Sequence, residues 1–472
     1  MDANIWIGSQ EVVAAQYSER LSPYDGRVAS RAAICNAEDA KKALAVACKA
    51  AARAKKIPLH QRCAWLNDVA SRLKEQREIF AQVLCDEVGK PIGYARIEVD
   101  RCIETITLSA ETMRTMHGET INTDAMSSGR RAQAYWRREP VGVVVAITPF
   151  NFPLNLVAHK LAPALVAGNA VVLKPTPEAP LCAYKLAKLF IESPYAVADT
   201  LSVVYGDAEV GSTLVSSDIP RVISFTGSVG VGEIITKSAG IKKVSLELGG
   251  NAATYIDTSA DLEYAASRCA IGAFVNSGQV CISLQRIYVD STIYDEFAQK
   301  MADATAKLVV GSPYNEETFL GPLINDEAAE RAMDWIESAI AEGARPLTPP
   351  RCEGRIFYPC VMADVTESMK IVCEEVFAPI VSLVRVDGIN DAIKRMNNSP
   401  YGLQFSIFTN NLAHATQAIE ELDAGGIVIN DMPTLRFDIQ PYGGVKLSGV
   451  GREGPRFAIE EMTEIKSIVI LP

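Results

Sequence analysis

Short apolar segments alternate with helix-like segments through the middle of the chain, and this rhythm predicts a parallel sheet. Four segments are mostly apolar, at residues 143–147, 170–173, 201–204 and 222–225. Helix-like stretches separate them at intervals of roughly 20–30 residues, which is typical of βαβ units. Strands that are covered on both faces read as near-continuous apolar runs. The pattern therefore indicates a doubly wound α/β region.

Helices are expected ahead of this sheet. Asn36 is followed by Ala-Glu-Asp, a combination that caps a helix and places acidic residues in its first turn. The helix that begins there is alanine-rich and should run over residues 36–56. A second helix is expected over residues 60–89, where Gly-Lys-Pro ends it, and a third over about 101–117.

A second α/β region is expected after Glu247, and two further strands stand apart from both regions. The strands of the second region are expected at residues 253–256, 286–289, 380–383, 405–408 and 427–430. Residues 132–138 and 467–471 also have the pattern of strands. Exposed strand edges of this kind usually need a pairing partner.

The composition fits a multidomain globular protein. A chain of 472 residues is too long for one ordinary core, so at least two domains are expected. With 48% hydrophobic and 22% charged residues, it resembles soluble proteins. A net charge of −11 without a basic stripe argues against nucleic-acid binding.

Cysteine usage and the absence of targeting segments predict a cytoplasmic protein. The eleven cysteines show no repeated CxxC spacing, which argues against a disulfide framework or a zinc cluster. No signal peptide is visible, and no apolar run is long enough to cross a bilayer. We therefore expect neither a metal site nor a membrane partner.

Four motifs carry the candidate chemistry. They are Thr148-Pro-Phe-Asn-Phe-Pro153, Leu246-Glu-Leu-Gly-Gly-Asn251, Phe274-Val-Asn-Ser-Gly-Gln-Val-Cys281 and Glu374-Glu-Val-Phe-Ala-Pro379. A thiol nucleophile needs a nearby group that activates it or activates the water that later releases the product. The four motifs, in this order, resemble the aldehyde dehydrogenase superfamily, and the resemblance covers nearly the whole chain.

The resemblance implies an aldehyde dehydrogenase-like α/β fold. A Rossmann-type cofactor domain would comprise residues 1–120 and 140–247, and a second α/β catalytic domain residues 248–446. Residues 121–139 and 455–472 would form a small β oligomerisation element, a hairpin and a tail. The resemblance also implies a homodimer or homotetramer.

The same resemblance assigns the catalytic residues. Cys281 would attack the aldehyde carbon to give a thiohemiacetal, with Asn151 and the Cys281 backbone N–H as oxyanion donors. After hydride transfer, Glu247 would activate water to hydrolyse the thioester. The branch that passes the thioester to coenzyme A typically lacks this glutamate, so hydrolysis is favoured. A coenzyme A-acylating enzyme and a catalytically inactive homologue remain the alternatives.

The segment from Ser224 to Gly232 is the candidate phosphate-binding turn. It joins a strand to a helix whose N-terminus favours a phosphate, although it does not match GxGxxG. A tight turn without a ligand would have the same pattern. The resemblance implies an NAD site; the residues carried over to it are Lys174, Thr226, Gly227, Ser228, Gly230, Leu248, Glu375 and Phe377. Pro177 stands where many NAD-preferring members have a glutamate, so NADP is not excluded.

Three basic residues fall where the family lines its substrate tunnel. They are Arg101, His159 and Arg436, and Phe152 is placed in the same pocket. Guanidinium groups bind phosphate, sulfonate and carboxylate in bidentate fashion. The pattern therefore favours a short aldehyde with an anionic far end. Each basic residue has a plainer explanation: a surface ion pair for Arg101, a satisfied helix histidine, and a loop salt bridge from Arg436 to Asp438.

The pattern of basic residues resembles that of one branch of the superfamily. This branch contains phosphonoacetaldehyde, lactaldehyde and non-phosphorylating glyceraldehyde-3-phosphate dehydrogenases. Some phosphonate-type relatives carry a further arginine where this chain has Val280. A phosphono-, sulfo- or carboxyaldehyde is the expected substrate, and a small neutral hydroxyaldehyde such as lactaldehyde is the alternative.

Overall fold

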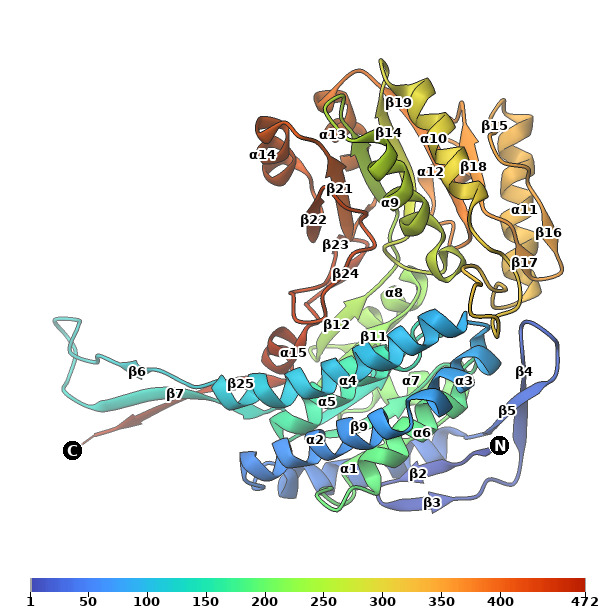
Figure 1. The fold of residues 1–472 in the computed structure, drawn as a ribbon. Helices are drawn as coiled ribbons and strands as arrows, with labels where there is room; N and C mark the ends of the chain where they lie inside the picture. Colours follow the sequence, from blue (N-terminus) through green and yellow to red (C-terminus); the bar gives the residue numbers. More distant parts are fainter. Residues whose placement is uncertain (1, 472) are drawn as a thin grey trace.

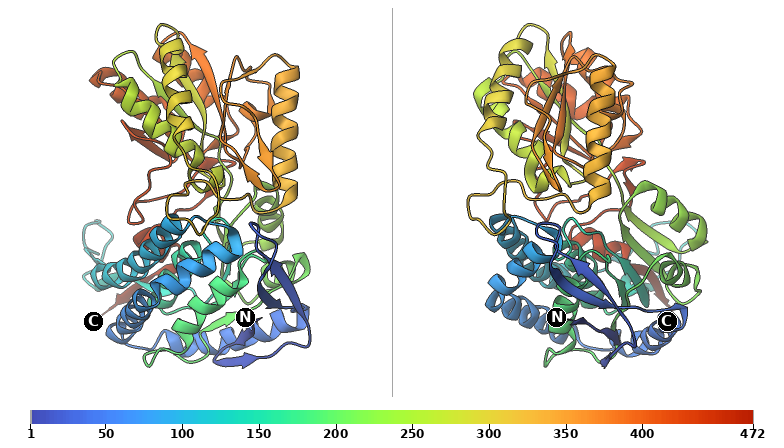
Figure 2. Two further views of the ribbon diagram at one scale, coloured as in Figure 1. Left: turned by 45° about the vertical axis from the view of Figure 1, so that its right-hand side comes forward. Right: turned by 90° about the vertical axis from the view of Figure 1, so that its right-hand side faces the viewer.

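Two sheets form the framework of the protein, which is known here from a computed structural model that describes residues 2–471. In Figures 1 and 2 the N-terminal half, with its helices, lies below, and the second sheet, with its own helices, lies above. This arrangement confirms the predicted fold class of two successive α/β regions.

The first sheet has eight strands, and its centre is parallel. In spatial order the strands are β24 (Gly449–Val450), β12 (Lys243–Glu247), β11 (Val222–Thr226), β8 (Val143–Ile147), β9 (Ala170–Lys174), β10 (Leu201–Val203), β2 (Ile5–Ile7) and β3 (Gln10–Val12). Every residue of β9 and β10 is buried, as expected for strands covered on both faces. The four predicted apolar runs are its strands β8 to β11.

The helices of the first region follow the predicted order but not all the predicted boundaries. They are α1 (Ala37–Ala54), α2 (Leu59–Glu75), α3 (Arg77–Val88), α4 (Ile92–Thr115), α5 (Asn155–Ala167), α6 (Pro180–Ile191), α7 (Ala208–Ser216), α8 (Val229–Ala239) and α15 (Pro455–Glu461). Asn36 caps α1 through a capping box, as predicted.

Two helix predictions were wrong in their boundaries. The single helix expected over residues 60–89 is broken at Gln76, whose φ of −104° and ψ of 16° are not helical. The helix expected from Arg101 begins at Ile92 instead, directly after Pro91. Proline fixes φ and lacks an N–H, so it suits the start of a helix better than the interior.

The second sheet has seven strands and begins just after β12. In spatial order they are β15 (Arg345–Pro346), β18 (Cys360–Ala363), β19 (Ile380–Val386), β14 (Leu284–Asp290), β13 (Ala252–Ile256), β21 (Gln404–Phe408) and β22 (Gly426–Ile429). Its helices are α9 (Leu262–Phe274), α10 (Tyr294–Ala306), α11 (Asp326–Ala341), α12 (Lys370–Cys373), α13 (Ile389–Asn397) and α14 (Leu412–Glu421). Residues 253–256, 286–289, 380–383, 405–408 and 427–429 are strands, as predicted.

Smaller pairings complete the fold. A three-stranded sheet near the N-terminus is built from β1 (Asp2–Ala3), β5 (Val28–Ala33) and β4 (Tyr17–Leu21). Two further pairs are β16 (Cys352–Glu353) with β17 (Ile356–Phe357), and β20 (Tyr401–Gly402) with β23 (Val445–Lys446).

A long arm projects from the body of the molecule (Figure 1). It is a three-stranded sheet of β6 (Thr120–Ile121), β7 (Gln133–Pro140) and β25 (Thr463–Ile470), with β25 antiparallel to β7 along its whole length. The two strands predicted to stand apart from both α/β regions therefore pair with each other.

The register of the first sheet brings predicted site residues to one edge. Thr226 lies opposite Glu247 at the carboxyl ends of β11 and β12, and Ile147 lies opposite Lys174 at those of β8 and β9. Open α/β sheets bind ligands outside the carboxyl ends of their strands. Within residues 2–471, no helix is long and apolar enough to cross a membrane.

Candidate active site

A cavity of about 570 Å³ is lined by segments from both sheet regions. Among the predicted site residues, its wall contains Cys281, Glu247, Asn151, Thr226, Gly227, Ser228, Leu248, Glu375, Phe377, Arg101, Phe152 and Arg436. Lys174, Gly230 and His159 lie outside this wall. The structure therefore gathers residues that are more than 300 positions apart in the chain around one cavity.

A tight left-handed turn precedes Cys281. The 3₁₀ segment Val275–Gly278 follows α9, and Asn276, Ser277 and Gly278 have φ values of 53°, 56° and 71°. Successive positive φ values are costly for residues with a Cβ, and such strain is held only where the surroundings determine it. The turn ends α9 and aims the following segment into the cavity.

Gly278→Ala is expected to damage this turn. A Cβ at residue 278 would lie 2.3 Å from the Ala378 carbonyl oxygen, in addition to the strain of the positive φ. We expect a destabilisation of about 1–3 kcal/mol and at least about a tenfold loss of kcat/KM, because small displacements of a reacting group are costly. Thermal unfolding and steady-state kinetics measure both effects. Gly93→Ala, where a Cβ meets open space in α4, is the matched control and should be neutral or slightly stabilising.

Cys281 is half-buried, and among the described residues its sulfur has one hydrogen-bond partner, the hydroxyl of Tyr442. Its Sγ lies 3.0 Å from Tyr442 Oη, and the Arg436 guanidinium lies 3.6 Å from the centre of the Tyr442 ring. Burial raises the pKa of the thiol to about 11, while the Tyr442 hydrogen bond and the charge of Arg436 act to lower it. A hydroxyl that donates to the thiolate therefore offsets part of the cost of forming it.

Tyr442→Phe is expected to raise the pKa of the Cys281 thiol further, by about one unit, because a hydrogen bond to the charged form is lost. The measurement is the pH dependence of inactivation by iodoacetamide, followed as loss of activity. Tyr294→Phe, which removes a buried hydroxyl bonded to Leu383 in the second sheet, is the control and should leave the profile in place. An unchanged profile in Tyr442→Phe would show that this hydroxyl does not act on the sulfur.

Hydrogen bonds of Asn151 connect the segment after β8 to the left-handed turn that precedes Cys281. Asn151 Nδ2 donates to the Gln279 carbonyl at 3.0 Å, and its Oδ1 accepts from the Phe152 N–H. Its own carbonyl accepts from Lys90 Nζ at 2.7 Å and from Asn276 Nδ2 at 3.3 Å. Since Nδ2 carries two hydrogens, one is left to donate to a group in the cavity.

Glu247 ends β12 with its carboxylate buried and without a hydrogen-bond partner among the described residues. Burial, and then the charge of Glu453, raise the pKa of Glu247 well above its ordinary value, against the opposing charges of Arg436 and Lys160. Lys160 Nζ donates to Glu453 Oε1 at 3.1 Å. Carboxyl groups shifted by burial and a like charge are candidates for general bases.

The turn between β11 and α8 fits a nicotinamide dinucleotide. Thr226 Oγ1 is buried without a partner in the described chain, and a Cβ on Gly230 would meet nothing within 4 Å. Ser228 is the N-cap residue of α8, so backbone N–H groups of the first turn are available to a phosphate. Lys174 is buried at the end of β9, and burial lowers its pKa. Lys174, Thr226, Ser228 and Gly230 are the residues that would hold the phosphates and adenine side.

A second group of residues would hold the nicotinamide side. Glu375 Oε1 accepts the Gly250 N–H at 3.0 Å, and burial raises the pKa of Glu375 to about 7. Phe377 has a positive φ of 52° and packs edge-on against Phe150, with ring centres 5.9 Å apart. A buried carboxyl and an aromatic wall suit a ribose hydroxyl and a flat ring, respectively.

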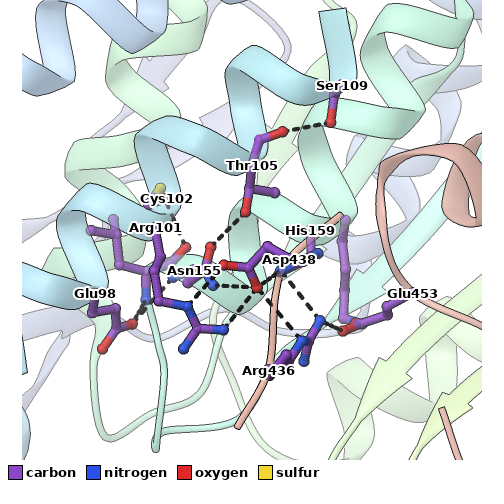
Figure 3. Close-up of polar contacts among 12 residues, drawn as sticks. Glu98, Arg101, Cys102, Thr105, Ser109, Asn155, His159, Arg436, Asp438 and Glu453 are labelled. Carbon is purple, nitrogen blue, oxygen red and sulfur yellow. Dashed lines mark hydrogen bonds and ion pairs between the residues drawn. The ribbon is translucent and has the colours of Figure 1, made fainter. Parts of the chain in front are cut away.

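The three predicted basic residues meet at one end of the cavity, but they are not free (Figure 3). Arg101 forms a bidentate pair with Asp438, at 2.8 and 2.7 Å, and His159 Nε2 lies 3.0 Å from the same carboxylate. Arg436 donates to Glu453 at 3.1 Å. His159 is fully buried behind the wall; burial and the charge of Arg436 lower its pKa, so it is held in the neutral form.

The simpler structural roles expected for Arg101, His159 and Arg436, namely ion pairs and a satisfied histidine, are confirmed in part. Arg101 pairs with neither Glu98 nor Asp100: Glu98 pairs with Lys90, and Asp100 pairs with Arg77. The salt bridge expected between Arg436 and Asp438 is present, with 3.5 Å between Arg436 Nε and Asp438 Oδ1. His159 has the partner expected of a satisfied helix histidine.

Sequence reasoning missed three residues of the site, Tyr442, Glu453 and Lys160, and named Asp438 only as the salt-bridge partner of Arg436. Tyr442 stands in the Pro-Tyr-Gly-Gly segment and could have been noted as a polar residue among glycines. Lys160 directly follows His159 in a helix whose residues are all buried, where a charged side chain needs a partner. Nothing local distinguishes Glu453 from other acidic loop residues, and nothing local shows that Asp438 also binds Arg101 and His159.

Comparison with known proteins gives consistent matches along the chain. The model of the aldehyde dehydrogenase family matches residues 6–468. A 3-sulfolactaldehyde dehydrogenase from Priestia aryabhattai is 43% identical over 467 residues, which cover 99% of this chain and 97% of that protein.

Solved structures also match over nearly the whole chain. Aldehyde dehydrogenase 21 from Physcomitrella patens, in complex with the reaction product succinate, has a TM-score of 0.97 and 37% identity, covering 99% of this chain and 98% of that one. The glyceraldehyde-3-phosphate dehydrogenase GapN from Methanocaldococcus jannaschii, complexed with NADP, has a TM-score of 0.92 and 38% identity, covering 97% of this chain and 99% of that one.

Proposed function

This chain belongs to the aldehyde dehydrogenase family, and we propose that it oxidises a short aldehyde with an anionic far end to the carboxylic acid. The observation that carries the substrate class is the meeting of Arg101 and Arg436 in the wall of the cavity that also holds Cys281. The relatives support it: the Priestia protein is named for a sulfonated aldehyde, and the Physcomitrella enzyme is complexed with succinate. The cofactor is a nicotinamide dinucleotide, as in the family.

In the proposed mechanism Cys281 attacks the aldehyde carbon as a thiolate. Tyr442 donates to the sulfur before attack, and the free hydrogen of Asn151 Nδ2, with the Cys281 N–H, stabilises the oxyanion of the thiohemiacetal. The chemistry supplied by a bound nicotinamide cofactor is acceptance of a hydride from the substrate carbon. Cys281 then holds the acyl group as a thioester, and Glu247 takes a proton from the water that hydrolyses it.

The test is reduced-cofactor formation with a panel of aldehydes, with NAD and NADP in parallel. The panel contains propionaldehyde, lactaldehyde, succinate semialdehyde, sulfoacetaldehyde, phosphonoacetaldehyde and glyceraldehyde 3-phosphate. We expect an anionic member to exceed propionaldehyde in kcat/KM by at least about tenfold, and Arg436→Leu to remove most of that preference. Equal rates with propionaldehyde or lactaldehyde would favour the neutral-aldehyde alternative. A rate increase with coenzyme A would favour the acylating alternative.

We also propose a cytoplasmic homodimer or homotetramer, with residues 121–139 and 455–472 as the oligomerisation element. The arm exposes apolar side chains, among them Ile465, Val469 and Leu471, each more than half exposed in the single chain. Exposed edges and apolar surface of this kind favour pairing with another chain. Light scattering coupled to size-exclusion chromatography measures the state; a monomer at micromolar concentration would contradict the proposal.

A further inference from the structure

We propose that Asp438 limits the substrate anion to a single negative charge, so that the enzyme selects a sulfonate or carboxylate over a phosphonate or phosphate. This inference rests on the proposed function, because it concerns the anion that Arg101 and Arg436 would bind. It is carried by the number and placement of the charged groups at that end of the cavity.

Asp438 lies behind the two arginines rather than in the cavity. Its side chain is 4% exposed, whereas that of Arg101 is 26% exposed and lines the wall. Both Asp438 oxygens are held by Arg101, and Oδ1 is also close to His159 Nε2, to Arg436 Nε and, at 3.5 Å, to Asn155 Nδ2 (Figure 3). Burial alone would raise the pKa of Asp438, but the hydrogen bonds from His159 and Arg101 hold it well below its ordinary value. Asp438 is therefore a fixed negative charge.

The charges around Asp438 nearly cancel. Three cations, Arg101, Arg436 and Lys160, face two carboxylates, Asp438 and Glu453, and these five groups contact one another directly. His159 adds no charge: its Nδ1 is buried with no acceptor among the described residues for the second N–H of an imidazolium, and burial lowers its pKa. The surplus of three cations over two carboxylates is a single positive charge.

Two further arginines lie near the cavity but form no ion pair with these five groups among the described residues: Arg331 lies beside Glu375, and Arg452 donates to the Gly444 and Gly451 carbonyls. Lys90 and Glu98, which also line the cavity, form a buried pair of their own. Val280, beside the nucleophile, is apolar and contributes no cation. Glu247 is either neutral or negative, so it cannot increase the surplus, and its raised pKa favours the neutral form.

The hydrogen-bond donors that remain also suit one small anion. Arg101 uses Nε and Nη2 on Asp438, and Arg436 uses Nη2 on Glu453. Arg436 Nε has no hydrogen-bond partner among the described residues, because its contact with Asp438 is a charge contact at 3.5 Å. Nη1 of Arg101 and Nη1 of Arg436 make no hydrogen bond with a described residue, so one group of each arginine remains for an acceptor that enters the cavity. A singly charged anion would balance the surplus, whereas a second negative charge would face Asp438 and Glu453 uncompensated.

A matched pair of substrates tests the charge limit. Sulfoacetaldehyde and phosphonoacetaldehyde share one carbon skeleton and a tetrahedral head group. At pH 8 the sulfonate carries one negative charge and the phosphonate, like a phosphate ester, nearly two. We expect kcat/KM of the wild-type enzyme for sulfoacetaldehyde to exceed that for phosphonoacetaldehyde by at least about tenfold. Succinate semialdehyde in the same series distinguishes carboxylate from sulfonate, both of which satisfy the limit.

Variants of Asp438 then test whether this residue causes the preference for a singly charged anion. Asp438→Asn removes the charge and should lower the sulfonate-to-phosphonate ratio at least about tenfold, whereas Asp438→Glu keeps the charge and should keep the ratio. The ratio is unaffected by a general loss of activity, which a purely structural role would cause for both substrates. Asp100→Asn, in the same helix as Arg101 but paired with Arg77, is the control and should leave the ratio unchanged.

The outcomes separate this inference from the proposed function. If propionaldehyde matches both anions, the proposed function and the charge limit are both wrong. If both anions exceed propionaldehyde but the phosphonate equals or exceeds the sulfonate in the wild-type enzyme, only the charge limit is wrong, and this result needs no folded variant. If the ratio favours the sulfonate and Asp438→Asn leaves it unchanged, the limit does not come from Asp438.

Discussion

Replacing Cys281 with serine is expected to abolish aldehyde oxidation, with a loss of at least about 10³-fold in kcat/KM. The site is arranged around a sulfur atom: Tyr442 Oη lies 3.0 Å from Sγ, and the charge of Arg436 favours the thiolate. A serine hydroxyl loses its proton far less readily than a thiol, and burial here already penalises the charged form of the thiol. Stopped-flow absorbance should show no burst of reduced cofactor in this variant.

The control for this prediction is Cys48→Ser, which changes an exposed cysteine of α1 that does not line the cavity and should leave the burst unchanged. A burst of wild-type amplitude in Cys281→Ser would mean that another side chain is the nucleophile. Complete inactivity of the wild-type protein with every aldehyde would support the inactive-homologue alternative instead.

Glu247→Gln is expected to keep the burst of reduced cofactor and to lower steady-state turnover by about 10²–10⁴-fold. The carboxylate of Glu247 has no hydrogen-bond partner in the described chain, so it is free to take a proton from water, and an amide of the same shape cannot do so. Since burial and Glu453 raise the pKa of Glu247, the base is protonated at low pH. Steady-state turnover should therefore rise with pH in the wild-type enzyme, and the part of the rise that belongs to Glu247 should vanish in the variant.

A buried carboxyl outside the cavity provides the control. Glu87 accepts from Ser30 and from backbone N–H groups of α6, and burial raises its pKa to about 7. Glu87→Gln should leave the ratio of burst to turnover unchanged. If Glu247→Gln instead removes burst and turnover equally, Glu247 acts before the thioester forms, and hydrolysis needs another base.

The sequence predicted those parts of the fold that local pattern controls. Residues 143–147 and 170–173 were recognisable as strands because both faces of β8 and β9 are covered, which requires continuous apolar residues. The break at Gln76 was missed because the residues on either side of it are all compatible with a helix. The early start of α4 was missed although Pro91 was available as a signal.

The site was predictable only where a motif carries it. Cys281 and Glu247 stand in segments that resemble family motifs, and both line the cavity. The pairing of Arg101 with Asp438 joins residues 337 positions apart, and no local pattern records it. Charge compensation depends on which side chains meet after folding, so the sequence could place three basic residues near the substrate but could not show what neutralises them.

The residues proposed to choose the substrate and those proposed to transform it stand on different elements. Arg101 and His159 belong to α4 and α5, and Asp438 to the loop before Pro441, whereas Glu247 ends β12 and Cys281 follows the left-handed turn. Substitutions of Arg101, His159 or Asp438 can therefore alter the head group accepted without moving the nucleophile or the base, whereas Arg436 and Lys160 also act on Cys281 or Glu247. For protein engineering, and for divergence among duplicated genes, this separation makes substrate range the property that changes most easily while the reaction itself is retained.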